Sequence, residues 1–359
     1  MSVDKNRPLD PGQEKIRGQA GAALNSLEGL LEEAEASHLM MFALKKEVFD
    51  LLEHGRTAGE LAEMLGFDTR KTKAFLDALA AIGLLEKGGL AKNGDGTYRL
   101  SSLSALYLKS SSPFCSRELL ERRFARLLSP RELEVSLSRP SEGSSVQRSG
   151  PNPAKKDPQL FTRIMVQHAR GSGNLSKLTH LVCRHPRFFQ ARRMLDLGGG
   201  HGLYAAALCR INPELEGVVF DFPEIVEVAR RYIAKTKLES RITTRGGDFY
   251  SDFPGEGYQI VLAVNAIHRS PEILRDVLEK VFLSLDSGGV LYLQHRYLNR
   301  SRTAPRKAAL FYFNRILEVD SFYLPTLREA REAGEKAGFH LTGLFRYGGG
   351  DTCLRLERR

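Results

Sequence analysis

The chain has 359 residues, of which 27% are charged and 42% hydrophobic, and its formal net charge is +10. This composition is typical of a globular protein and excludes a largely disordered chain, and the length suffices for two domains. No apolar run approaches the roughly 20 residues of a membrane-spanning helix, so we expect no integral membrane segment.

Cysteine usage and the start of the chain both indicate a reducing compartment. The first fifteen residues are polar and lack the apolar core of a secretory signal. Cys115, Cys183, Cys209 and Cys353 are scattered without paired spacing, and no Cys/His cluster predicts a metal site. We therefore expect a cytoplasmic protein that holds no metal.

The amino-terminal third is predicted to be helical. We expect a flexible tail over residues 1–20, followed by two or three amphipathic helices between residues 22 and 53, where apolar residues recur at helical spacing. Thr57 and Glu60 form the sequence signature of a capping box at the start of the next helix. Asp68 is expected to cap the helix after that.

A hairpin is predicted over residues 89–101, with Asn-Gly-Asp-Gly as its turn. Helix, turn, helix and hairpin form the order of a winged helix, which we assign to residues 21–115. Arg70, Lys71 and Lys73 could contact phosphates, but no side chains repeat along one helix face to read base edges. A packing or dimerisation module is therefore expected, and nucleic-acid binding is not.

The rest of the chain is divided into a helical connector, residues 116–185, and a larger domain, residues 186–359. The connector contains a predicted mobile loop over 136–158, rich in Ser, Pro and Gly. From residue 193 onward, buried strands alternate with helices, which predicts a mostly parallel sheet covered on both faces. A ligand is then expected at the carboxyl ends of the strands.

A glycine-rich loop follows the first strand of this domain. Gly198, Gly200 and Gly202 allow a sharp turn and the close approach of a ligand. Asp221 ends the next strand, where its carboxylate could bind both hydroxyls of a ribose. Together these residues favour an adenosine-containing ligand.

Two cofactors are compatible with the loop alone. Residues 200–205 satisfy the relaxed dinucleotide pattern GxGxxA, whereas the GxGxG register that begins at Gly198 is flush with the strand and suits S-adenosylmethionine. Asp248 and Phe249, at the end of the third strand, could hold an adenine by its exocyclic amine and its ring face. This arrangement favours the methyl donor over a nicotinamide cofactor.

Taken in order, the motifs LDLGGGHG, VVFDFPEIV, GGDF, NAIH and SGGVLYL resemble those of class I S-adenosylmethionine-dependent O-methyltransferases of the acetylserotonin/caffeate type. The resemblance covers about residues 20–350. It implies a Rossmann-like α/β methyltransferase domain, a winged-helix dimerisation domain and a homodimer. It also implies that Gly198, Gly200, Gly202, Asp221, Asp248, Phe249 and Asn265 bind S-adenosylmethionine, and that Met165 touches the substrate.

His268 matches the general base of that family. A histidine can remove the proton of a hydroxyl as methyl transfer begins. The family's two acids that orient this base would fall at Gln294 and Leu324, neither of which is charged. His295 and Tyr297 are nearby alternatives between which the sequence does not decide.

The expected reaction is methyl transfer to a hydroxyl of a small, aromatic molecule. A cluster of basic residues after the fifth strand suits an anionic acceptor: Arg296, Arg300, Arg302, Arg306 and Lys307. The alternatives left open are C-methylation of a pigment or tetrapyrrole-like substrate, a non-methylating cofactor-binding protein and a winged-helix regulator.

Overall fold

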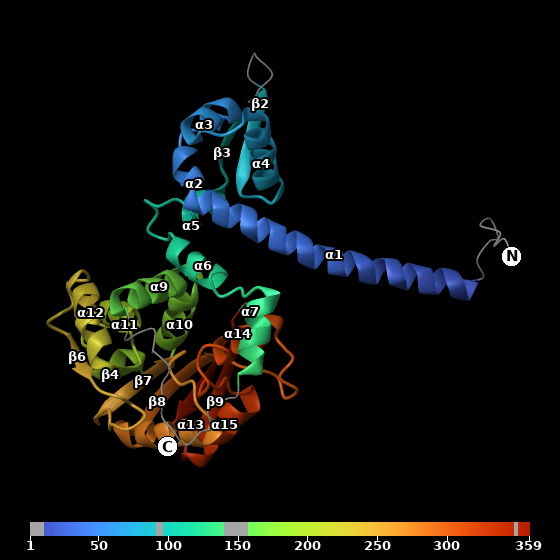
Figure 1. Ribbon diagram of the computed structural model, residues 1–359. Coiled ribbons are helices and arrows are strands. Elements are labelled where there is room, and N and C mark those ends of the chain that lie inside the picture. The colour runs from blue at the N-terminus through green and yellow to red at the C-terminus, as the bar shows by residue number, and fades with distance from the viewer. Residues whose placement is uncertain (1–10, 91–95, 140–156, 348–350) are drawn as a thin grey trace. The chain divides into compact units, whose positions relative to one another are not determined.

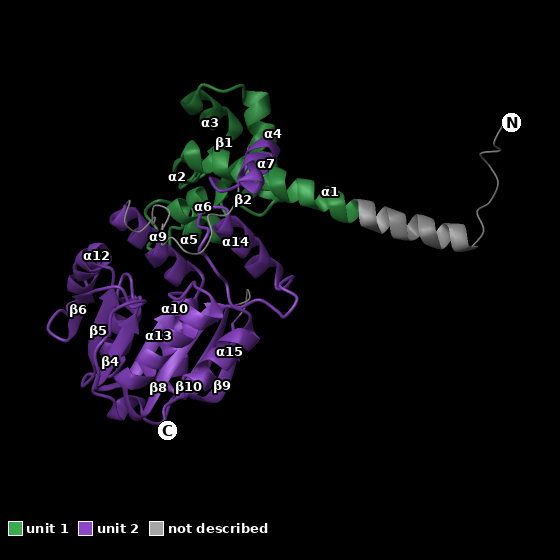
Figure 2. Cartoon of the chain, turned by 60° about the horizontal axis from the view of Figure 1, so that its bottom comes forward, with its two compact units in different colours: residues 1–124 green, residues 125–359 purple. Residues whose placement is uncertain are grey.

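The structure is a computed structural model, shown in Figure 1, and it describes residues 11–90, 96–139, 157–347 and 351–359. The chain forms two compact units, residues 1–124 and residues 125–359, coloured separately in Figure 2. The turn of the predicted hairpin and residues 140–156 of the predicted mobile loop lie outside the described residues. No helix in the described ranges is both long and apolar enough to cross a membrane.

Unit 1 contains helices and one small sheet. Its elements are α1 (Pro11–Lys45), α2 (Val48–Leu51), β1 (Arg56–Thr57), α3 (Ala58–Leu65), α4 (Thr69–Ala81), β2 (Leu85–Leu90), β3 (Gly96–Leu100), α5 (Ser102–Tyr107) and α6 (Arg117–Phe124). β3 pairs antiparallel with both β2 and β1. Thr57 and Glu60 form the expected capping box, and the Asp68 side chain accepts a hydrogen bond from the amide of Lys71.

The amino-terminal helix differs from the expected pattern. One helix, α1, begins at Pro11 and ends at Lys45, so residues 11–20 of the predicted tail are helical. Proline is well tolerated in the first turn of a helix, where its missing N–H has no intrahelical partner. The buried side chains of α1, among them Ala43 and Leu44, lie near its carboxyl end, in the core of unit 1.

Unit 2 begins at Ala125, which departs from the separate connector predicted over 116–185. The amino-terminal elements of this unit are α7 (Pro130–Ser138), α9 (Pro158–Gly171), α10 (Asn174–Cys183) and the 3₁₀ helix Phe188–Gln190. Residues 136–138 of the predicted loop therefore belong to α7, which starts at a capping box of Ser129 and Glu132.

A regular alternation of strands and helices follows. Its elements are β4 (Arg193–Leu197), α11 (Leu203–Ile211), β5 (Glu216–Asp221), α12 (Pro223–Ala234), β6 (Ile242–Gly246), β7 (Tyr258–Val264), α13 (Pro271–Ser284), β8 (Leu285–Arg296), α14 (Arg306–Ile316), α15 (Leu327–Lys336), β9 (His340–Arg346) and β10 (Asp351–Glu357).

The strands of unit 2 form one seven-stranded sheet in the order β6-β5-β4-β7-β8-β10-β9. β4 to β8 are parallel, and β10 is antiparallel to both of its neighbours. One hydrophobic core joins a face of the sheet to α10, α11 and α12, and a second joins the other face to α13 and α15. The predicted fold class, a mostly parallel α/β domain preceded by a helical domain, is confirmed.

This topology determines where the functional residues meet. The carboxyl ends of β4, β5, β6, β7 and β8 lie along one edge of the sheet, because these strands run in the same direction. In open parallel sheets this edge is where ligands bind. The glycine loop, Asp221, Asp248 and His268 all follow strands that end at this edge.

Candidate active site

The loop between β4 and α11 is packed against the protein at two of its glycines and open at a third. Gly198, Gly200 and Gly202 have φ values of +64°, +54° and +70°, in the left-handed region that favours glycine. A Cβ on Gly198 would lie 2.5 Å from the Cβ of Ala266, and one on Gly202 would lie 3.0 Å from the Ile233 side chain. A Cβ on Gly200 would meet no heavy atom within 4 Å. The loop therefore has room for a ligand at Gly200.

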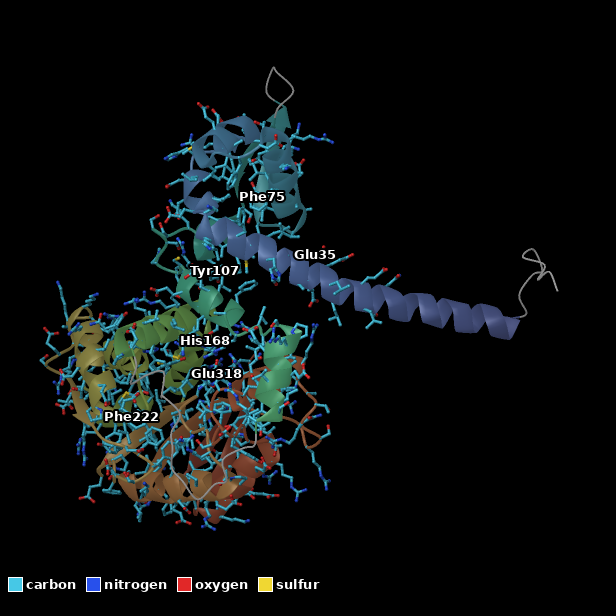
Figure 3. The ribbon with its side chains drawn as sticks, in the orientation of Figure 1. Glu35, Phe75, Tyr107, His168, Phe222 and Glu318 are labelled. Carbon is cyan, nitrogen blue, oxygen red and sulfur yellow. The ribbon has the colours of Figure 1, made fainter. Side chains whose placement is uncertain are left out.

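Asp221 joins the end of β5 to this loop. Its Oδ2 accepts a hydrogen bond from the amide of Gly200 over 2.9 Å, and its Oδ1 accepts one from the amide of Phe222 over 2.8 Å. Phe222, labelled in Figure 3, precedes α12. Burial raises the pKa of Asp221 to about 6, although both amides favour the ionised form. Two hydrogen bonds thus hold the Asp221 carboxylate in position, but they only partly offset the cost of burying its charge.

Asp196 is a second acidic group beneath the loop, and the motif analysis did not single it out. Its side chain is almost fully buried, and neither of its carboxylate oxygens has a hydrogen-bond partner of ordinary geometry. Burial raises its pKa to about 7, and the nearby amide of Ala205 only partly offsets this effect. An unpaired buried carboxylate at a ligand-binding edge is suited to a cationic or hydrogen-bond-donating ligand.

Asp248 and Phe249 lie in the turn that follows β6. The Asp248 Oδ1 accepts a hydrogen bond from the amide of Tyr250 over 3.0 Å. The buried Phe249 ring approaches the glycine loop, since its Cε1 would lie 3.4 Å from a Cβ on Gly198. The ammonium of Lys280 donates to the carbonyls of Phe249 and Tyr250 and so holds this turn. Phe249 and the glycine loop are therefore adjacent.

Asn265 and Met165, the other two predicted site residues, lie on different elements. Asn265 directly follows β7, has a φ of +50°, and donates its amide to the carbonyl of Gln294 over 2.9 Å. Met165 lies on α9 and is partly buried. Its backbone is hydrogen-bonded to the ring of His201, whose Nδ1 accepts from the amide of Leu203 over 3.1 Å. His201 thus connects α9 to the glycine loop, a contact that the sequence did not indicate.

His268 lies four residues beyond the end of β7 and is held by several contacts. Its amide donates to the hydroxyl of Tyr250 over 3.1 Å, and its ring stacks on Phe322 with the ring centres 4.8 Å apart. Its Nδ1 lies 3.1 Å from the Nε2 of His295. Burial, followed by the charges of His295 and Arg315, lowers the pKa of His268 well below its usual value. A neutral imidazole at this position can act as a base.

The expected alignment of the fifth-strand acid with Gln294 is corrected by the structure. Side chains alternate along β8, so that Gln294 shares a face with Tyr292, whereas His295 shares the opposite face with Leu293. It is His295, not Gln294, that contacts His268. The Gln294 amide is completely buried, and neither its oxygen nor its nitrogen has a hydrogen-bond partner.

Leu324, the second expected acid position, and Tyr297, the other alternative partner, do not reach His268 through their side chains. Leu324 is fully buried in a small cluster with Leu298 and Phe322. The hydroxyl of Tyr297 donates to the carbonyl of Leu293 over 3.2 Å and is therefore occupied elsewhere. Between the two alternatives that the sequence left open, the structure selects His295.

Two of the five basic residues expected to attract an anion are paired with carboxylates. Arg296 Nε lies 3.3 Å from Asp351 Oδ1, and its Nη2 lies 2.9 Å from the Nε2 of His168, which Figure 3 labels on α9. Arg302 lies 3.7 Å from Glu329. Arg300, Arg306 and Lys307 are exposed. This neutralisation weakens the argument for an anionic acceptor.

No group of three or more His, Cys, Asp or Glu side chains suited to hold a metal occurs in the described part of the chain. The groups gathered at this edge of the sheet are the loop amides, the two buried carboxylates and the histidine pair. These groups fit the cofactor that the sequence implies. Gly200 leaves space at the loop, and a sulfonium nucleoside carries a positive charge and hydrogen-bond donors that complement the two buried carboxyl groups, of which Asp196 has no hydrogen-bond partner.

Comparison with known proteins identifies the family of the chain. The sequence profile of the O-methyltransferase domain matches residues 156–340, and that of the O-methyltransferase dimerisation domain matches residues 29–110. The chain is 28% identical over 285 residues to 3-hydroxy-5-methyl-1-naphthoate 3-O-methyltransferase of Streptomyces sahachiroi, which covers 77% of this chain and 78% of that protein.

Two solved structures show the same fold. An O-methyltransferase family protein from Burkholderia thailandensis has a TM-score of 0.76 and 24% identity, covering 93% of this chain and 98% of that one. Human N-acetylserotonin methyltransferase in complex with S-adenosylmethionine has a TM-score of 0.69 and 18% identity, covering 99% of both chains. The chain belongs to the O-methyltransferase family and is an S-adenosylmethionine-dependent methyltransferase.

Proposed function

We propose that this enzyme transfers the methyl group of S-adenosylmethionine to a hydroxyl of a small aromatic molecule, with His268 as the general base. The observation that carries this proposal is the position of His268. The histidine follows β7 at the same sheet edge as the open glycine loop of β4, the neighbouring strand. The relative of this chain from Streptomyces sahachiroi is named for methylation of a hydroxynaphthoate, which supports an aromatic acceptor.

The cofactor is assigned to seven residues around the glycine loop. Backbone groups of Gly198, Gly200 and Gly202 would line its methionine end, and Asp221 would bind the ribose hydroxyls. The remaining residues would hold the adenine and complete the cofactor site: Asp248, Phe249 and Asn265. When bound, S-adenosylmethionine supplies an electrophilic methyl group, and the protein positions the acceptor oxygen in line with it.

His268 would remove the hydroxyl proton of the acceptor, a role for which a neutral imidazole is suited. Met165 would contact the acceptor from α9. The tyrosine and phenylalanine that hold His268 restrict its motion: the Tyr250 hydroxyl accepts from its amide, and Phe322 covers its ring. A base held in this way would be positioned to meet the acceptor hydroxyl.

A homodimer is proposed from the dimerisation domain matched over residues 29–110 and from the exposed leucines of α1, Leu27, Leu30 and Leu31. A reducing compartment such as the cytoplasm is supported by the four cysteines, all of which are unpaired.

The direct test is transfer of an isotope-labelled methyl group from S-adenosylmethionine to a panel of hydroxyarenes, with the product analysed by mass spectrometry and NMR. We expect a methoxy signal in the product and formation of S-adenosylhomocysteine. A label bound to ring carbon would replace the O-methyl assignment by C-methylation. Binding of duplex DNA without any methyl transfer would instead favour a regulatory protein.

A further inference from the structure

The base of this enzyme is paired with a second histidine instead of a carboxylate. His295 lies at the end of β8, is 2% exposed, and places its Nε2 3.1 Å from the Nδ1 of His268. Within the part of the chain that the structure describes, no Asp or Glu carboxylate is hydrogen-bonded to the His268 ring. The orientation and proton location of the base therefore depend on the His295 ring and on the carbonyl of Asn265, which is hydrogen-bonded to the His268 ring.

The other nitrogen of His295 determines which tautomer that ring adopts. Its Nδ1 lies 2.8 Å from the carbonyl oxygen of Arg296. A carbonyl only accepts, so at this distance Nδ1 carries the proton. The opposite neutral tautomer would place a nitrogen lone pair against the carbonyl oxygen. With its proton on Nδ1, neutral His295 has its lone pair on Nε2, and the carbonyl of Ile267 also contacts this ring.

The tautomer of His268 follows from that of His295. The Nε2 of His295 can only accept, so the Nδ1 of His268 must donate across the 3.1 Å contact. A neutral His268 then has its lone pair on Nε2, which is the atom able to take a proton from the acceptor. His295 thus sets the reactive nitrogen of His268, as an orienting carboxylate does in a catalytic triad.

We propose that His295 is a positioning residue that holds His268 as the Nδ1-protonated tautomer and leaves Nε2 as the basic atom, and that this uncharged pair serves acceptors with an acidic hydroxyl. This inference rests on the proposed function of His268. A carboxylate would stabilise the imidazolium that forms on proton transfer, whereas neutral His295 cannot supply the opposite charge. The hydroxyl should therefore be more acidic than a simple phenol, whose pKa is about 10.

The charged groups around the two rings also favour the neutral form of each histidine. Arg315 from α14 and Arg269 from the same loop both disfavour a cationic His268, and the carbonyl of Asn265 opposes them. Around His295, burial and Arg296 disfavour the cation, while Asp351 and the carbonyls of Arg296 and Ile267 oppose them, and the pKa falls to about 4. Both rings are therefore neutral at pH 7. The Tyr250 hydroxyl accepts a hydrogen bond from the backbone amide of His268.

The first test reads the tautomers directly and needs no acceptor. Histidine labelled with ¹⁵N and ¹³C is incorporated into the full-length protein, and the signals of the pair are assigned with the variants His268→Gln and His295→Glu. At pH 7 we expect both rings to be protonated on Nδ1 and unprotonated on Nε2. A proton on Nε2 of either ring, or a doubly protonated ring, would overturn the proposal even if the enzyme is an active methyltransferase.

The second test uses pH–rate profiles of kcat/KM with substituted phenols of graded acidity as acceptors. In the wild type, the acid limb should lie below pH 6.5, and nitrophenols should be methylated faster than unsubstituted phenol. The variant His295→Glu should keep His268 in the same tautomer while raising its pKa, which moves the acid limb upward by at least one pH unit. The variant His295→Phe should lose about ten-fold or more in kcat with cofactor affinity unchanged.

Tyr297→Phe is the matched control, because Tyr297 neighbours His295 but bonds to the Leu293 carbonyl. Its acid limb should coincide with that of the wild type. An acid limb that does not move in His295→Glu, or that moves equally in Tyr297→Phe, would refute a positioning role. If no phenol is methylated, the proposed function fails while the NMR result still decides the tautomers.

Discussion

The amide of Gly200 donates a hydrogen bond to Oδ2 of Asp221 over 2.9 Å, which joins the loop after β4 to the end of β5. Gly200 is at the same time the glycine of this loop whose missing side chain leaves open space. Asp221 therefore holds the loop in the conformation that keeps this space accessible. Asp221 therefore contributes both to the shape of the proposed cofactor site and to its negative charge.

Gly200→Ala should weaken cofactor binding much more than it weakens the fold. A non-glycine residue at a φ of +54° costs about 1–2 kcal/mol, and its methyl group would enter the space assigned to the cofactor. We expect the dissociation constant of S-adenosylhomocysteine to rise by roughly ten-fold or more, which is about 1.4 kcal/mol. Isothermal titration calorimetry measures this change.

Gly66→Ala is the control for backbone strain. Gly66 follows α3 in unit 1, has a φ of +67° and likewise has no atom within 4 Å of an added Cβ. It should lose a similar free energy of unfolding while retaining cofactor affinity. Equal losses of cofactor affinity in both variants would show that strain, and not occupied space, is responsible.

Asp196→Asn should stabilise the cofactor-free protein at alkaline pH and weaken cofactor binding. Burial raises the pKa of Asp196 from 3.8 to about 7, so the folded state binds a proton more tightly than the unfolded state. The contribution of Asp196 to the free energy of unfolding is fully present below pH 4 and is lost as the pH rises to about 7. Asp221, with a pKa of about 6, acts in the same direction over a narrower window.

The variant and the wild type are compared by urea unfolding at pH 5 and pH 8 without cofactor. We expect the asparagine variant to gain on the order of 2 kcal/mol relative to the wild type between these two pH values. A difference that is the same at both pH values would mean that Asp196 is not held as an unpaired buried carboxyl.

Leu31→Glu should disrupt a homodimer formed through α1. Leu31 is 67% exposed and Leu27 is 62% exposed, which is unusual for large apolar side chains that lie on one helix. A glutamate there would place an unpaired charge in the proposed interface. Sedimentation equilibrium should show a twofold lower mass for this variant, whereas the exposed-site control Glu32→Gln should keep the wild-type mass. A wild-type mass for Leu31→Glu would remove α1 from the interface.

The local features of the fold could be predicted from the sequence. The capping residues Thr57 and Asp68 and the alternation of strands and helices are short-range properties of residue type. The glycine loop and Asp221 were predictable for the same reason, since positive φ values and strand ends leave a signature in the residues themselves.

The partner of the base could not be predicted with certainty, because it depends on strand register. A shift of one residue moves every side chain of a strand to the other face, and the register of β8 is set by its pairing with β7 and β10. The sequence alone therefore gives no reason to prefer Gln294 or His295 as the partner of His268, although their side chains lie on opposite faces of β8. The contacts of Phe322 and Tyr250 with His268 depend on long-range packing in the same way.

The most direct measurement of the central claim is the turnover of His268→Gln together with its affinity for S-adenosylmethionine. Glutamine keeps the size and polarity of the side chain but cannot accept a proton at neutral pH. We predict that the dissociation constant stays within about two-fold of the wild-type value while kcat falls by roughly 10²–10⁴, the range attributed to general base catalysis. Wild-type turnover in this variant would contradict the assignment of His268 as the base.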